Sequence, residues 1–477
     1  MPNQQTSRWL CLAVLCTGVL MIVLDQTIVN VALPSIQADL GFSQAGLAWV
    51  VNAYLIAFGG ILLLAGRLGD LLGRRTVFLA GLAVFTGASA VCGLSGSQAM
   101  LVGARFVQGV GGATTMAPVL GMIVTMFDDA AGKAKAIGVY SFVASAGASI
   151  GLLMGGVLTQ ALNWHWIFFV NLPIGLAVGL LTVRLLEPEK GLGMAAGADG
   201  LGAALVTASL MLGVYAIVDS PELGSAGAAA LGLAAVALMA GFLVRQAVAE
   251  KPLMPLTIFR SRSISAANAV EALTVAAMIG MFFLCSLYLE RVLNFSPLEL
   301  GISFLPASLS ISALSLWLAP RLNVRFGERN VLLAGLAISL VGLVLISRAP
   351  AAGRYLTDVL PAMLLVGVGI GVMFPALMTL AMAGVGPEDA GLASGLINTS
   401  GQVGGALGLA ALATLAAGRT QGLLSAGAGS AEALTAGYDL AFVGCAILFV
   451  AAIAIALTML RSTCEAPEMC PEIPAAA

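Results

Sequence analysis

Three charged residues stand inside long apolar stretches of this sequence and are the first candidates for chemistry. Asp25, Arg105 and Glu271 are each flanked by segments made mostly of aliphatic residues. A charged side chain at the centre of a bilayer costs about 2.5–3.5 kcal/mol on insertion scales, so it persists where it faces a cavity or a partner. A carboxyl group so placed can bind and release a proton, and a neighbouring arginine favours its ionised form. The three residues predict a proton-binding centre within a membrane.

The positions of Asp25 and Arg105 within their segments allow them to pair. Asp25 lies eight residues before Leu33, at the end of an outward-running segment, and Arg105 lies seven residues after Gln98, at the start of an inward-running one. At about 1.5 Å per helical residue, both side chains lie roughly 10–12 Å below the outer end of their helices. Two interpretations stay open: a pair that takes part in proton exchange, and a permanent pair that only holds two helices together.

Glu271 lies in the inner half of a later apolar segment. A carboxylate there can receive a cationic substrate or a second proton, and the alternative is an acid near the membrane interface.

Composition and segment length predict an all-α polytopic membrane protein embedded in a lipid bilayer. Hydrophobic residues make up 60% of the 477 residues, charged residues 9%, and the mean hydropathy is +1.03. A soluble domain carries about 25% charged residues, so this chain has too few charges to cover a surface that faces water. A bilayer core about 30 Å thick needs roughly 20 apolar residues per helix. Fourteen spans are predicted, at 9–33, 45–66, 76–96, 98–121, 135–160, 167–186, 199–219, 226–248, 264–288, 298–319, 330–348, 357–382, 389–417 and 437–460.

Basic and aromatic residues predict the orientation of these spans. With a cytoplasmic N-terminus, sixteen of the 21 Lys and Arg residues lie at inner loops and ends, four lie in outer loops, and Arg105 lies within a span. Cytoplasmic loops are enriched in Lys and Arg, and tryptophans gather at the two interfaces. All five tryptophans lie within a few residues of a predicted helix end. An even number of spans then places both termini in the cytoplasm, and we expect the inner (plasma) membrane of a bacterium.

Several classes of function find no support in the sequence. The net charge of −2 comes without a basic domain or stripe, which argues against a nucleic-acid partner. The seven cysteines form no CxxC pair, so we expect neither a metal site nor a disulfide framework. No GxxxxGK[ST] loop is present, which argues against direct use of ATP. The apolar segment from Trp9 to Leu33 is too long for a cleavable signal peptide. We expect a transporter without cofactors rather than an enzyme.

One loop sequence occurs twice and indicates two parallel halves. GRLGDLLGRR, from Gly66 to Arg75, follows the second span, and PRLNVRFGER, from Pro320 to Arg329, follows the tenth. Parallel halves of six helices are a known transporter plan, with the substrate site between them near the middle of the membrane. The seventh and eighth spans are then an insertion. The predicted divisions are a six-helix bundle at 1–190, two additional helices with their linkers at 191–252, a second six-helix bundle at 253–461 and a disordered cytoplasmic tail at 462–477.

Several motifs, in order along nearly the whole chain, resemble the major facilitator superfamily and its branch of fourteen-span drug:proton antiporters. They are LDQTIVNVALP (24–34), GRLGDLLGRR (66–75), RFVQGVGGA (105–113), WHWIFFVNLPIG (164–175) and YLERVLNFSPLELG (288–301). The chain departs from that pattern twice. Leu152 stands in GLLMGG where the antiporter motif of the fifth helix carries proline, and His165 stands where arginine is common. The resemblance implies the major facilitator fold, with two six-helix bundles and two inserted central helices.

The resemblance also assigns expected roles. It places the helices of Asp25 and Arg105 beside a central cavity, so that Asp25 binds the proton and Arg105 tunes it. Gly66, Asp70, Gly73 and Arg74 match the loop that latches the two halves on the cytoplasmic side. Asp70 is expected near the N-terminus of another helix, where the helix dipole favours an anion. Val324 replaces this acid in the second copy, so only the first copy is expected to latch. The alternative is that the arginines of this loop only set the topology.

Uncharged polar residues within the spans are candidates for contacts with substrate. Asn398 and Gln402 share one helical face with Ser394, at spacings of four and eight residues. Asn30, Asn52 and Gln108 lie in the first, second and fourth spans. Such side chains bind substrate or hydrogen-bond another helix, and both interpretations stay open. His165, the only histidine, lies between Trp164 and Trp166, which favours an interfacial belt residue over a proton relay.

Together these features predict a proton-coupled multidrug exporter that acts as a monomer. It exchanges inward protons for outward lipophilic or cationic small molecules by alternating access of the two bundles. The alternative is a dedicated exporter of one metabolite, such as a self-made antibiotic, a lipid or a siderophore, on the same fold. A membrane sensor or chaperone is a third hypothesis, and it requires a folded signalling domain for which no loop is long enough.

Overall fold

The structure is a computed structural model, and it describes residues 2–127, 130–188, 191–193, 197–382 and 390–460. Within these ranges the chain is helical and contains no strand. The predicted tail, 462–477, lies outside the described residues. The end of the bundle at which α1 begins is called the inner end below.

The helices fall into an N-terminal half, an inserted hairpin and a C-terminal half. The N-terminal half comprises α1 (Pro2–Leu40), α2 (Trp49–Leu72), α3 (Arg74–Gly93), α4 (Gln98–Met116), α5 (Val119–Met126), α6 (Ala130–Ala161), α7 (Trp166–Phe169) and α8 (Asn171–Leu185). The hairpin is α9 (Gly200–Val218) and α10 (Ser220–Val248). The C-terminal half comprises α11 (Arg262–Arg291), α12 (Pro297–Ala313), α13 (Ala319–Phe326), α14 (Glu328–Ile346), α15 (Leu360–Met382), α16 (Ala390–Ser425) and α17 (Ser430–Met459). Short 3-10 or π turns precede or interrupt α2, α11, α13 and α15.

Thirteen helical segments of the described chain are long and apolar enough to cross a membrane. Five of these segments combine consecutive helical elements, as in Gln98–Met126, which holds α4 and α5. The remaining predicted span, 135–160, corresponds to α6, a helix of 32 residues. With α6 counted, each of the fourteen predicted spans corresponds to a helical segment of the described chain. Several predicted spans were too short. For example, α1 covers Pro2–Leu40 rather than 9–33, because polar residues continue the helix beyond the apolar stretch.

Local sequence explains where several helices begin and end. Ser97 caps α4 by accepting from the Met100 N–H, and Ser296 and Glu299 form a reciprocal capping box at the start of α12. Gly73 ends α2 with φ 92° and ψ 130°, and Gly327 ends α13 with φ 77° and ψ 145°. A positive φ favours glycine. The two copies of the repeated loop therefore share one backbone turn at the same position of the repeat.

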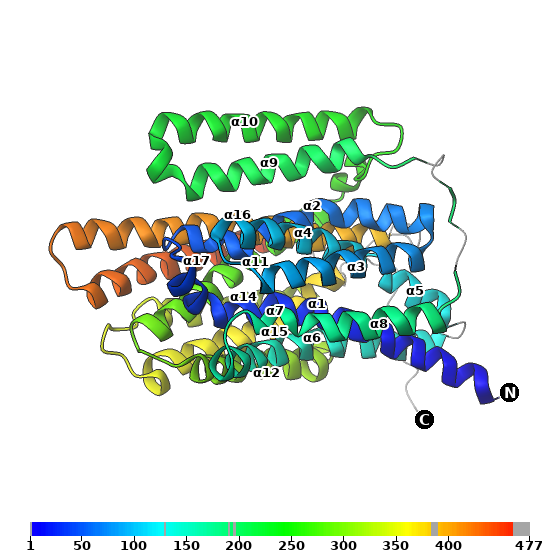
Figure 1. Cartoon of the computed structure of the whole chain (residues 1–477), viewed down its shortest axis with the longest axis horizontal. Coiled ribbons are helices and arrows are strands. Elements are labelled where there is room, and N and C mark those ends of the chain that lie inside the picture. The colour runs from blue at the N-terminus through cyan, green and yellow to red at the C-terminus, as the bar shows by residue number, and fades with distance from the viewer. Residues whose placement is uncertain (1, 128–129, 189–190, 194–196, 383–389, 461–477) are drawn as a thin grey trace, which may run out of the picture.

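The same pairs of helices pack in both halves, as the repeat predicts. In the N-terminal half α1 contacts α6 and α8, and α4 contacts α2 and α3. In the C-terminal half α11 contacts α16 and α17, and α15 contacts α12 and α14, which are the corresponding helices. The two halves meet along two seams, named here the α2–α16 seam and the α6–α12 seam. Figure 1 shows the hairpin lying outside both halves, with α9 between α10 and the rest of the molecule.

Glycines bring backbones together at both seams. A Cβ on Gly59 of α2 would lie 2.9 Å from the Gln402 Cβ of α16. A Cβ on Gly156 of α6 would lie 2.6 Å from the Pro297 carbonyl oxygen, and one on Gly301 of α12 would lie 2.7 Å from that of Leu152. Such small residues allow membrane helices to approach closely. The α6–α12 contact therefore depends on glycine from both halves.

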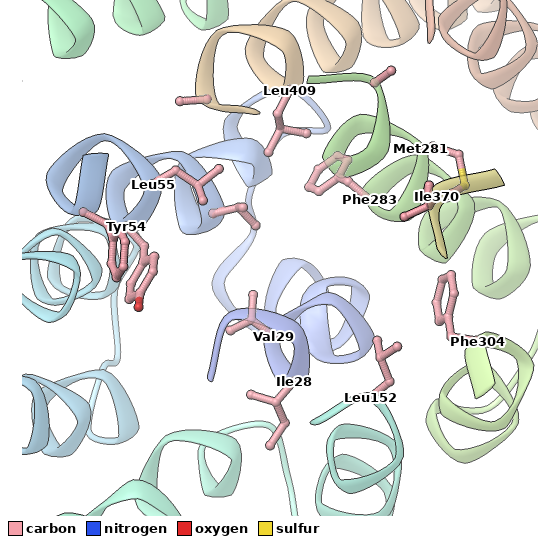
Figure 2. Packing of buried hydrophobic residues seen from close by; sticks show 14 of the residues in the cluster. Ile28, Val29, Tyr54, Leu55, Leu152, Met281, Phe283, Phe304, Ile370 and Leu409 are labelled. Atoms are coloured by element: carbon pink, nitrogen blue, oxygen red, sulfur yellow. The ribbon is translucent and has the colours of Figure 1, made fainter. Parts of the chain in front are cut away.

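The centre of the molecule is apolar and draws on both halves. Figure 2 shows Ile28 and Val29 of α1, Leu55 of α2, Leu152 of α6 and Phe283 of α11 around it. Leu152, which replaces the proline of the related motif, is 4% exposed. Leucine keeps its backbone N–H, which proline lacks, so α6 runs through this position as a continuous helix.

Gly111→Val should destabilise the protein, because a Cβ at this position would lie 2.7 Å from the Phe85 Cα of α3. Overpacking of this kind costs about 1–3 kcal/mol. The matched control is Gly103→Val in the same helix, where no atom lies within 4 Å of the added Cβ. Thermal unfolding of the detergent-solubilised protein measures both variants. Equal losses would show that the α3–α4 contact does not depend on Gly111.

Candidate functional site

Asp25 of α1 and Arg105 of α4 form a buried ion pair, as their matched depth allows. Arg105 Nη1 donates to Asp25 Oδ2 at 2.6 Å, and the two side chains are 0% and 1% exposed. Both helices belong to the N-terminal half. An ion pair in this setting is stable only when the remaining polar atoms also find partners.

Two amide side chains supply the remaining donors to Asp25. Gln108 Nε2 and Asn171 Nδ2 each donate to Asp25 Oδ1 at 2.8 Å. With the guanidinium, the carboxylate accepts from three N–H groups. Gln108 lies one turn after Arg105 on α4, and Asn171 begins α8. Ser89 of α3 extends the network, because its Oγ accepts from Gln108 Nε2 at 2.8 Å.

Arg105 is held on several sides. Its Nη1 also donates to Gln108 Oε1 at 2.6 Å, and its Nε donates to the Val50 carbonyl of α2 at 3.0 Å. The guanidinium carbon lies 4.4 Å from the centroid of the Tyr54 ring and 5.7 Å from that of Phe168. Aromatic faces stabilise a cation that has lost its water. The network therefore stabilises both buried charges.

Two members of this network were not selected from the sequence. Asn171 stands inside the WHWIFFVNLPIG motif and Ser89 in the third span, and each is a polar residue in an apolar stretch. That signal marked Asn30 and Asn52 equally well, so it could not separate network members from other polar residues. The Oδ1 atom of Asn171 has no hydrogen-bond partner among the described residues, although it is buried.

Glu271 lies apart from this network, on α11 of the C-terminal half. It is 4% exposed, which disfavours the interfacial alternative, and its Oε2 has no hydrogen-bond partner within the described chain. The carboxyl group packs on Gly401 of α16, where an added Cβ would lie 3.1 Å from Glu271 Oε1. One turn away, Asn268 Oδ1 accepts from Ser400 Oγ at 2.7 Å. Glu271 is a buried acid with an unused acceptor atom.

The predicted gating residues gather at the inner ends of α2 and α3. Arg74 contacts Asp70 at 3.4 Å and donates to the Gly121 carbonyl at 3.3 Å. Gly73 makes the turn between the two helices, and a Cβ on Gly66 would meet no atom within 4 Å. The contacts described for Asp70 and Arg74 stay within the N-terminal half and the linker after it. A latch to the C-terminal half is a prediction, and the inner loop 383–389 lies outside the described residues.

Within the described chain, no hydrogen bond joins the predicted substrate-contact residues to one another. Asn30 Nδ2 donates to the Gln26 carbonyl and Asn398 Nδ2 to the Ser394 carbonyl, each within its own helix. Asn52 is fully buried, and both of its amide atoms lack a partner in the described part of the chain. Gln402 Oε1 also lacks one.

His165 stacks on Trp164 with ring centroids 3.7 Å apart, as suits the interfacial interpretation. Among the described residues, no group of three His, Cys, Asp or Glu side chains is placed to hold a metal ion.

Comparison with known protein families shows which family the chain belongs to. The model of the Major Facilitator Superfamily matches residues 15–409. The chain belongs to the major facilitator superfamily. In this superfamily member, the buried network and the duplicated loop therefore lie within a transporter fold.

Relatives of this superfamily member are resistance and export proteins of bacteria. The puromycin resistance protein pur8 of Streptomyces alboniger is 38% identical, over 88% of this chain and 84% of its own length. The cephamycin export protein CmcT of Amycolatopsis lactamdurans is 37% identical, over 93% and 90%. The multidrug resistance protein Stp of Mycobacterium tuberculosis is 34% identical, over 84% and 74%.

A solved structure supports the fold. A bacterial homologue of the human lysosomal transporter Spinster superimposes with a TM-score of 0.67 at 17% identity, covering 96% of this chain and 99% of its own.

Arg105→Met should destabilise the protein strongly, because it leaves the buried Asp25 carboxylate without its cation. Removing one partner of a buried pair costs about 3–5 kcal/mol. Replacing both members, as Asp25→Asn with Arg105→Gln, should recover much of the loss, since no unpaired charge remains. The matched control is Arg74→Gln, which breaks an exposed pair worth about 0.2–1 kcal/mol. Thermal unfolding in detergent measures all three variants. Similar small losses in Arg105→Met and Arg74→Gln would argue against a tightly held pair.

Proposed function

We propose that this protein is a proton-coupled exporter of lipophilic, often cationic, small molecules in the bacterial plasma membrane. The observation that carries the proposal is the buried Asp25–Arg105 pair, in a chain whose relatives are named for antibiotic resistance and export. Transport proceeds by alternating access of the two halves. Both termini are placed in the cytoplasm, and the monomer is the working unit.

The energy for export comes from the proton gradient. Each elementary charge that crosses a potential of 100 mV supplies about 2.3 kcal/mol, to which the pH difference adds. Asp25 is assigned to bind the proton. Its protonation removes the charge that Arg105 pairs with and turns one acceptor oxygen into an O–H donor, so the N–H groups that donate to that oxygen are displaced. Because a packed network shifts between discrete arrangements rather than gradually, this change can select one conformation over the other.

Glu271 is the second acid in the scheme. Its Oε2, which has no hydrogen-bond partner among the described residues, and its place on α11 support assigning it to receive a proton or the cationic group of a substrate. Gly66, Asp70, Gly73 and Arg74 are assigned to the inner gate.

A dedicated exporter of one metabolite is the second candidate. It is favoured by the relative named for the export of cephamycin, a single antibiotic. The two candidates share the fold and the coupling site and differ in the range of substrates. A panel of chemically unrelated dyes and antibiotics separates them, since export of one compound alone supports the dedicated exporter.

Asp25→Asn should abolish transport driven by a pH gradient. The amide preserves the size of the side chain but cannot take up and release the coupling proton. Uptake of a fluorescent dye into proteoliposomes measures the effect, with a pH step as the only driving force. The control is Glu432→Gln, which neutralises an exposed acid at the start of α17. Unaltered coupling in Asp25→Asn would refute the role of this carboxyl group, and absence of pH-driven transport in the unmodified protein would refute proton coupling itself.

Glu271→Gln should weaken transport of cationic dyes more than transport of neutral ones. The expected change is a roughly tenfold rise in KM, which corresponds to about 1.4 kcal/mol. Initial rates for a cationic and a neutral dye in the same proteoliposomes give the comparison. Equal KM values in the variant and the unmodified protein would exclude Glu271 from substrate binding.

A further inference from the structure

The inserted hairpin lies over the seam between the two halves. Its first helix, α9, packs on α2 of the N-terminal half and on α16 of the C-terminal half, whereas α10 packs mainly on α9. Figure 1 shows this order from the outside inward, with α10 outermost and α9 next to α16 and α2. The bilayer-facing side of the α2–α16 seam is thus occupied by α9.

The outer end of α9 is fastened to both halves. Trp49 Nε1 of α2 donates to Oδ2 of Asp219, the residue that follows α9, at 3.2 Å. Thr414 Oγ1 of α16 donates to the Ile217 carbonyl at 3.4 Å. The two contacts come from different halves and end within three residues of each other.

The middle of α9 fits closely against α2. A Cβ on Gly60 would collide with the Thr207 side chain, and its distance to the Thr207 Cα would be 3.4 Å. Thr207 cannot turn away without loss, because its Oγ1 donates to the Ala203 carbonyl at 2.8 Å. Only glycine at position 60 therefore allows this approach without displacing α9.

The inner end of the hairpin joins both halves through an apolar cluster. The cluster contains Phe242 of α10 and Met254, which follows α10. Against them pack Leu63 of α2, Ile264 of α11 and Leu396 of α16. Val206 and Met239 of the hairpin pack against both this cluster and the main core.

Asp199 holds the two ends of the hairpin together beside this cluster. It accepts from Arg245 Nε at 3.1 Å and from Gln246 Nε2 at 2.8 Å, and it caps α9 through the Gly202 N–H. Burial alone would raise the pKa of Asp199, but these donors together lower it. The ionised carboxylate is therefore the form that fastens the hairpin.

The seam under α9 contains polar atoms that lack partners. Asn52 lies two helical turns before Gly59, so it is on the same face of α2. Both of its amide atoms, and Oε1 of Gln402 across the seam, have no partner among the described residues. An unsatisfied polar group exposed to hydrocarbon costs several kcal/mol. A seam with this composition needs a cover on its lipid side.

We propose that the α9–α10 hairpin is a lateral cover that closes the α2–α16 seam to the bilayer. Attachment to both halves keeps α9 over the seam while α2 and α16 move relative to each other. Lipid and lipophilic compounds are thereby kept from entering the interior between these two helices.

Labelling of a cysteine beneath the cover tests this proposal without any transport measurement. Asn52→Cys places a thiol at a position that is 0% exposed. In the unmodified cover, a lipid-soluble maleimide should label it slowly. Adding Gly60→Val, which displaces α9, should raise the labelling rate at least roughly tenfold, while a membrane-impermeant sulfonated maleimide stays unreactive. The matched control is Gly87→Val in α3, where no atom lies within 4 Å of an added Cβ. The chain without Asn52→Cys gives the background.

Rapid labelling beneath the unmodified cover, or equal labelling in Gly60→Val and Gly87→Val, would overturn the proposal. This outcome is independent of proton coupling, because no substrate or gradient is present.

Reducible cross-links provide a second test that does not depend on the folding of Gly60→Val. One pair, Trp49→Cys with Asp219→Cys, joins α9 to α2, and the other, Thr414→Cys with Ile217→Cys, joins α9 to α16. Each cross-link alone should leave dye transport at half its rate or more, since α9 can follow either half. Both together should stop transport until a reductant is added, because they lock α2 to α16. Full transport through both cross-links, or loss with either one alone, would contradict a cover shared by the two halves.

Discussion

The cost of holding two opposite charges in a medium of low dielectric constant constrains much of this structure. Asp25 and Arg105 lie away from water, where an ion pair is stable only if its other polar atoms are also satisfied. The chain meets this requirement with side chains from α3, α4 and α8 and a carbonyl from α2. With α1, which carries Asp25, five helices must keep their positions for one pair to exist. The packing of the helices in the N-terminal half and the stability of the Asp25–Arg105 pair therefore depend on each other.

The fold could be predicted from the sequence because it depends on the hydrophobicity of each segment and on short motifs, which can be read without knowing the contacts between helices. Apolar length sets the crossings, and GRLGDLLGRR and PRLNVRFGER reveal the duplication, which the structure repeats in the turns at Gly73 and Gly327. Matched depth allowed the pairing of Asp25 with Arg105, and the family resemblance placed their helices beside the same cavity. The roles of Asn171 and Ser89 did not, because a contact between distant helices depends on rotation about each helix axis. Helix ends were also missed where polar residues prolonged a helix, as at Pro2–Leu40.

The two halves share a plan but differ in where their acids lie. The N-terminal half surrounds Asp25 with donors, whereas the described residues of the C-terminal half provide no donor to Glu271 Oε2. The inner loops differ in the same way, since Asp70 of the first copy corresponds to Val324 of the second. Duplication thus preserved backbone geometry, which glycines and helix packing maintain, while ionisable groups diverged between the copies.

The hydrogen bond from Arg105 Nε to the Val50 carbonyl connects the charged centre to the backbone of α2. Because α2 forms one wall of the contact between the halves, any shift of that wall changes the surroundings of the guanidinium. Thermodynamic linkage makes such an effect reciprocal. In the proposed exporter, a compound that wedges α2 away from α16 and a proton bound at Asp25 act on the same hydrogen bond, so each changes the binding of the other by the same factor. In that scheme, the Val50 carbonyl couples the binding of the proton to the binding of the compound, although the two ligands do not touch each other.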